Sequence, residues 1–123
     1  MKLFTKLWEM LKPKKKPESP TINAIYRPSN WVVLKIEDNE TIFYKVLGVF
    51  RHSDWRVNSG IESVEEDEEH YYFYGMSGSL YICKKTLYGV DASFFPLNHL
   101  LQVDKVKVMP KSTKFLELCT TQK

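Results

Sequence analysis

Short strand-like runs, separated by turn-forming residues, most constrain what this chain can fold into. Runs rich in β-branched and aromatic residues occupy residues 31–36, 41–50, 60–64, 70–75, 79–83 and 103–109. The run at 41–50 is apolar on both alternating faces, which is typical of a central strand. The polar residues 37–40 before it predict a hairpin turn, and the next three runs predict a three-stranded meander.

The rest of the body offers few helical patterns. Residues 95–102 place Leu97, Leu100 and Leu101 on one helical face, and a weaker turn is expected at 113–118. A chain of 123 residues has room for one core. We therefore predict a mainly β fold, with α+β as the alternative: a small antiparallel barrel or strongly curved sheet of about six strands with one short helix, SH3-like or OB-like in shape. Such a shape implies no particular function.

The N-terminal residues differ from the body in charge. The formal charge of +3 is the sum of +5 over residues 1–28 and −2 over residues 29–123. We expect an amphipathic helical arm over residues 1–12, a Lys/Pro linker over residues 13–21, and a single β-rich domain over residues 22–123. The residues expected to bind a membrane or a partner are Leu3, Phe4, Leu7, Trp8, Leu11, Lys12, Lys14, Lys15 and Lys16.

Three interpretations of the arm remain open. It is an in-plane anchor on an anionic membrane, a helix that docks into the groove of a partner, or a helix that folds back onto its own body. A helix this short is only marginally stable alone in water, so all three interpretations require a surface against which it folds. Thr5, Lys6 and Glu9 interrupt the apolar residues that a secretory signal needs. The expected location is the cytoplasm, with the inner face of the membrane as the site of any peripheral attachment.

The sequence contains no motif for catalysis, metal binding or cofactor binding. Cys83 and Cys119 form no Cys/His cluster, so we expect no metal and no cofactor. Ser77 lacks the second glycine of a nucleophile elbow, and a hairpin turn explains its surroundings better. A small hydrolase that uses His52 or His99 with a neighbouring Ser or Cys is the weakest alternative. No catalytic residue is predicted, and the protein is expected not to be an enzyme.

Aromatic and acidic residues supply the candidate interaction face. Its predicted members are Trp55, Arg56, Tyr72, Tyr74, Tyr81, Glu66, Asp67 and Glu68. Exposed aromatics on such a fold can stack on single-stranded bases, but the acidic run at residues 65–69 opposes contact with phosphates. Tyr and Trp are also common anchors of protein interfaces. We therefore predict a non-enzymatic protein-binding, inhibitor or adaptor module, typical of phage or mobile-element accessory proteins, with single-stranded nucleic-acid binding as the alternative.

Overall fold

The fold consists of short strands with little helix. The computed structural model describes residues 22–51, 54–91, 94–102 and 105–118, and the predicted arm and linker lie outside them. Its strands are β1 (Ala24–Tyr26), β2 (Asn30–Asp38), β3 (Thr41–Val49), β4 (Trp55–Val57), β5 (Ile61–Glu66), β6 (His70–Gly75), β7 (Ser79–Lys84) and β8 (Val106–Val108). Its helical segments are η2 (Lys85–Leu87), α1 (Phe95–Leu101) and η3 (Phe115–Glu117).

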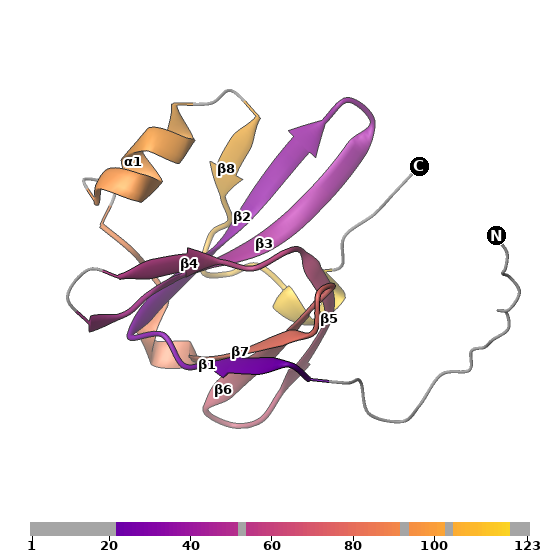
Figure 1. Cartoon of the computed structure of the whole chain (residues 1–123), viewed down its shortest axis with the longest axis vertical. Coiled ribbons are helices and arrows are strands. Elements are labelled where there is room, and N and C mark those ends of the chain that lie inside the picture. The colour runs from indigo at the N-terminus through magenta and orange to yellow at the C-terminus, as the bar shows by residue number, and fades with distance from the viewer. Residues whose placement is uncertain (1–21, 52–53, 92–93, 103–104, 119–123) are drawn as a thin grey trace, which may run out of the picture.

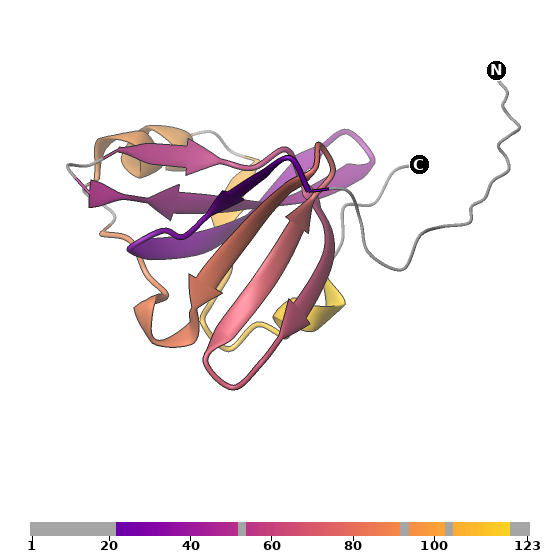
Figure 2. The same cartoon turned by 60° about the horizontal axis from the view of Figure 1, so that its bottom comes forward.

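The strands form two sheets of four strands each (Figures 1 and 2). The first, here called the meander sheet, has the order β1-β7-β6-β5, and the second, the hairpin sheet, has the order β4-β3-β2-β8. The predicted hairpin is confirmed, because β2 and β3 pair from Asn30 opposite Val49 to Asp38 opposite Thr41. Asn39 in its turn has a φ of 59°, a left-handed conformation that asparagine tolerates. The predicted meander of β5, β6 and β7 is also confirmed.

The mainly β prediction is confirmed, but the prediction of a barrel is wrong. No strand pairing joins the two sheets within the described residues, so the sheets pack face to face without closing. The sequence also missed β1 and β4, which have three residues each. β1 pairs with β7 in parallel, whereas only antiparallel pairs were expected. A parallel partner so distant in sequence leaves no local pattern that could reveal it.

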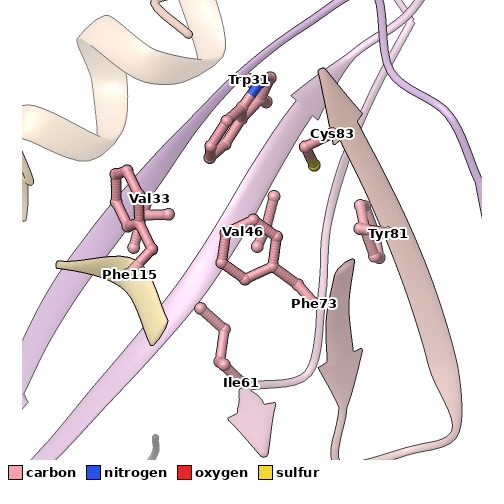
Figure 3. Close-up of a cluster of buried hydrophobic side chains, with 8 residues drawn as sticks. All are labelled: Trp31, Val33, Val46, Ile61, Phe73, Tyr81, Cys83 and Phe115. Carbon is pink, nitrogen blue, oxygen red and sulfur yellow. The ribbon is translucent and has the colours of Figure 1, made fainter. Parts of the chain in front are cut away.

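A core dominated by aromatic rings holds the two sheets together (Figure 3). Trp31 on β2 is fully buried, and its ring centroid lies 5.4 Å from that of Phe73 and 5.6 Å from that of Phe115. Its indole Nε1 donates a hydrogen bond of 2.8 Å to the carbonyl of Lys84, at the end of β7. The other members of this cluster are Val33, Val46, Ile61, Tyr81 and Cys83. Trp31 therefore links the hairpin sheet directly to the meander sheet.

A second core lies on the opposite face of the hairpin sheet. There, Val32, Leu34 and Leu47 pack against Leu97 of α1, and Leu100 adjoins them. The helix predicted at residues 95–102 and its apolar face are thereby confirmed. The hairpin sheet is covered on both faces, which explains why the run at 41–50 is apolar at consecutive positions.

We expect Trp31→Ala to lower the free energy of unfolding by about 3–5 kcal/mol, because it removes the largest buried side chain and its hydrogen bond. The matched control is Trp55→Ala, at a residue that is 49% exposed, and its expected cost is below about 1 kcal/mol. Urea denaturation followed by circular dichroism measures both. Equal losses in the two variants would contradict the central position given to Trp31.

Candidate interaction surface

The outer face of the meander sheet is the candidate site. On β6 and β7, Phe73, Tyr81 and Cys83 point into the inter-sheet core, so the residues that alternate with them point outward. The outward residues include Ile25, Glu65, Tyr72, Tyr74, Leu80 and Ile82, which are here called the outer tyrosine face, and the paired His70 and Lys84 end the same outward rows. None of the described helices or strands lies over this face (Figure 2). Within the described ranges, this face therefore has no covering element.

Strand register places the apolar side chains of this face next to one another. Leu80 lies opposite Ile25 on one side and Tyr74 on the other. Ile82 lies opposite Tyr72 in the next outward row. Leu80 and Ile82 are only 6% and 9% exposed, whereas Ile25 is 54% exposed. The face thus has an aliphatic centre that its taller neighbours partly cover.

Carboxylates hold the two tyrosine rings in place. The hydroxyl of Tyr72 donates to Oδ2 of Asp67 at 2.6 Å, and the hydroxyl of Tyr74 donates to Oε1 of Glu65 at 3.1 Å. The bond to Asp67 raises the pKa of Tyr72, while burial and then the bond to Glu65 raise the pKa of Tyr74. Both hydroxyls therefore stay protonated, and the rings lose less freedom when a partner binds.

The acidic residues 65–69 at the turn between β5 and β6 are held by specific hydrogen bonds and an ion pair. Oδ1 of Asp67 accepts hydrogen bonds from the backbone N–H groups of Glu69 at 2.9 Å and His70 at 2.7 Å, which closes the turn. The bond from Tyr72 and then these two bonds lower the pKa of Asp67 to about 2. Oε1 of Glu66 lies 2.9 Å from Nζ of Lys85. Asp67 is thus part of the turn, and Glu66 is paired at its side.

The structure divides the interaction face that the sequence predicts. Tyr72, Tyr74 and Asp67 come together on the meander sheet, and the exposed Glu68 lies in the same turn as Asp67. Trp55 and Arg56 lie on β4, in the other sheet.

The placement of Tyr81 on an exposed face is wrong, because its side chain is 1% exposed and packs in the inter-sheet core. Sequence reasoning instead missed Ile25, Leu80 and Ile82. The alternation of Leu80 and Ile82 with Tyr81 and Cys83 was the available signal, but it does not say which pair faces outward.

The candidates for catalysis that lie within the described residues do not come together in one site. Cys83 is fully buried, and burial raises the pKa of its thiol, which disfavours the nucleophilic thiolate. His99 is exposed on α1, while His52 lies outside the described residues. Nδ1 of His70 lies 3.6 Å from Asp67, within the turn already described. Among the residues that the structure describes, no group of three or more His, Cys, Asp and Glu could hold a metal ion.

The fold and the face define this chain in physical terms as a two-sheet, mainly β protein with an apolar, carboxylate-edged sheet face. Comparison with known proteins finds no matching family model, no matching curated protein and no matching solved structure. Within the described ranges, no helix is both long enough and apolar enough to cross a membrane. Function must therefore be argued from the chemistry of the surface.

We expect the Asp67 carboxyl to titrate near pH 2 in the full-length protein, and Tyr72→Phe to raise its pKa toward 3.8, because the largest stabilising bond to the carboxylate is lost. Tyr74→Phe is the matched control and leaves this pKa unchanged. NMR of the carboxyl carbon measures all three proteins.

The sign of the effect on stability follows from the lowered pKa. Ionised Asp67 contributes stability above its unfolded pKa of 3.8, and this contribution is lost as the pH falls toward about 2. The contribution is modest, because solvent screens this exposed group. A pKa in the Tyr72→Phe variant equal to that of the wild type would contradict the assigned hydrogen bond.

Proposed function

We propose that this protein is a non-enzymatic binding module that recognises another protein through the outer tyrosine face. One observation carries the proposal: the outward residues of β7 are Leu80 and Ile82, where a solvated antiparallel sheet would present polar side chains. Tyr72 and Tyr74 stand beside them with their hydroxyls already bonded. Pre-ordered tyrosines next to aliphatic side chains are typical anchors of protein interfaces.

The size of the face favours a short segment as the partner. The four strands lie about 4.8 Å apart, with about five steps of 3.3 Å in β5, β6 and β7 and about two in β1, so the face spans roughly 200 Å². A standard interface buries about 800 Å² on each partner, so this face alone suits an extended peptide segment rather than a whole domain.

The charges around the face favour a basic partner. Glu65 and Asp67 lie beside the tyrosines, and Glu68 and Glu69 extend the acidic turn, so these carboxylates outnumber the cation of Lys84 at the end of β7. Opposite charge on a partner increases its association rate and its specificity more than its affinity. The proposed partner is therefore a protein segment with apolar side chains flanked by Lys or Arg.

The same charges argue against nucleic-acid binding on this face. The charge of Arg27 reaches Tyr72, but both tyrosine hydroxyls are bonded to carboxylates. A backbone phosphate stacked above these rings would lie next to Glu65 and Asp67, and affinity for nucleic acid depends mainly on phosphate neutralisation. Protein binding is accordingly the function that the geometry supports best.

To test the face, random 12-residue peptides displayed on phage would be selected against the full-length protein at low salt. We expect enrichment of peptides that combine aliphatic or aromatic residues with Lys and Arg. Ile25→Ser should weaken the selected peptides about 5- to 30-fold, the range of a truncated interface anchor. Leu116→Ser is the matched control, since Leu116 is similarly exposed but lies on η3.

Two results would overturn this proposal. The first is enrichment of peptides without basic residues. The second is an equal loss of affinity in Ile25→Ser and Leu116→Ser, which would place the peptide elsewhere.

We further propose that residues 1–16 tether the module to an anionic membrane, with residues 1–12 as an in-plane helix and the lysines that follow it beside the lipid headgroups. The supporting pattern is an apolar helical face followed by the lysines at positions 12, 14, 15 and 16. Each such lysine contributes about 1 kcal/mol near an anionic surface.

In co-sedimentation with phosphatidylserine vesicles, we expect the full-length protein to pellet. The double variant Leu7→Glu/Trp8→Glu should stay in the supernatant, while Leu116→Glu should pellet like the wild type. If the double variant pellets as much as the wild type, the in-plane membrane anchor is wrong. The arm would then fold against a protein partner or against the body of this chain.

A further inference from the structure

A polar pocket of about 320 Å³ opens between the two sheets, apart from the outer tyrosine face. Its polar lining comes from Lys45, Arg56, Asn58, Ser59, Ser77 and Ser79. These residues belong to β3, β4, the segment between β4 and β5, and the start of β7 with the turn before it. Among the described residues that line it there is no Asp or Glu. The lining therefore combines cations, hydroxyls and an amide without a carboxylate.

Arg56 supplies a cation that forms no ion pair with any carboxylate of the described residues. Its guanidinium carbon lies 4.6 Å from the centroid of the Tyr26 ring, which orients it by a cation–π contact. Burial raises the pKa of Tyr81, and the positive charge of Arg56 lowers it in part. Neither Arg56 nor Lys45 forms an ion pair in the part of the chain that the structure covers. In a body with an excess of acidic residues, two unpaired cations at one pocket are notable.

Two of the lining residues, Asn58 and Ser79, carry buried polar groups that have no hydrogen-bond partner among the described residues. Asn58 is 4% exposed, and its Oδ1 accepts the N–H of Val46 at 2.9 Å, which leaves Nδ2 without an acceptor. Oγ of Ser79 is also buried without a partner. Each unsatisfied group costs about 1–3 kcal/mol. Both atoms lie next to Gly75, which has no side chain: a Cβ added there would lie 2.6 Å from Ser79 Oγ and 3.5 Å from Asn58 Nδ2.

The serine hydroxyls add further donors. Oγ of Ser59 accepts the backbone N–H of Ser77 at 2.9 Å, so its own hydroxyl proton remains available. Donors thus converge on the pocket from both sheets, and they outnumber the two oxygens that a carboxylate offers. A tetrahedral oxyanion presents acceptor oxygens in several directions and matches this arrangement better.

A second cavity, of about 620 Å³, adjoins the first and shares Tyr26 and Arg56 with it. Its lining also includes Phe50, Trp55 and Asp54, so the one carboxylate in the described lining of the combined space belongs to this second cavity. The combined space exceeds what a bare phosphate fills, since a water molecule takes about 30 Å³. The aromatic side chains offer a surface for a planar group attached to the phosphate.

We propose that this pocket binds the phosphate group of an aromatic phosphomonoester, with Arg56 and the serine hydroxyls as donors to the phosphate oxygens. The ring of the ligand lies against Tyr26 and Trp55. Small local shifts bring Asn58 Nδ2 and Ser79 Oγ within hydrogen-bond distance of the phosphate oxygens, which then accept from these two donors.

The test is isothermal titration of the full-length protein with phenyl phosphate, inorganic phosphate and benzoate at constant ionic strength. We expect phenyl phosphate to bind more tightly than inorganic phosphate, and benzoate to bind at least tenfold more weakly than phenyl phosphate. Arg56→Gln should lower the affinity for phenyl phosphate at least tenfold. Lys107→Gln is the matched control, an exposed lysine on β8, and should have no effect.

NMR locates the ligand independently of affinity. The side-chain amide of Asn58 should shift on addition of phenyl phosphate, because its unpaired N–H adjoins the pocket. Benzoate binding as tight as that of phenyl phosphate, Arg56→Gln behaving like Lys107→Gln, or an unchanged Asn58 amide would each overturn the proposal.

Discussion

The burial of Trp31 between the two sheets is the interaction on which the rest of the structure depends. No strand pairing joins these sheets in the described chain, so side-chain packing must hold them together. Trp31 contacts Phe73 across the core and Phe115 from the C-terminal segment, and its indole N–H is satisfied at Lys84. One side chain therefore fixes the meander sheet, the hairpin sheet and the chain after β8 relative to one another.

This arrangement decides which surfaces remain open. The hairpin sheet has the aromatic core on one face and α1 on the other, so it has no free face. In the described chain, helices and strands cover only one face of the meander sheet, and Leu80 and Ile82 lie beside Tyr74 and Tyr72 on the other. Because the sheets do not close, a seam also remains beside Arg56, and the polar pocket opens there. Both proposed sites follow from two sheets that pack without closing.

Long apolar runs in the sequence predicted their strands and helix correctly. Elements whose position depends on partners distant in the sequence could not be predicted. The sequence predicted the long hairpin, the meander and the helix at 95–102 from local patterns. It missed β1 and β4, since three residues cannot display an alternation. It identified Tyr72 and Tyr74 but placed Tyr81 with them, because every residue from Leu80 to Cys83 is apolar or aromatic. Only the position of Trp31 across the core decides which alternate residues face inward.

Methyl NMR of the full-length protein can decide whether the outer tyrosine face binds the proposed basic, apolar segment. The probe is a peptide selected for binding to the wild-type protein. We expect the methyl signals of Ile25, Leu80 and Ile82 to shift on binding, while those of Val32 and Leu34 on β2 and of Leu97 on α1 stay in place. Shifts confined to the methyl groups of Val32, Leu34 and Leu97, with those of the outer tyrosine face unchanged, would show that the segment binds elsewhere.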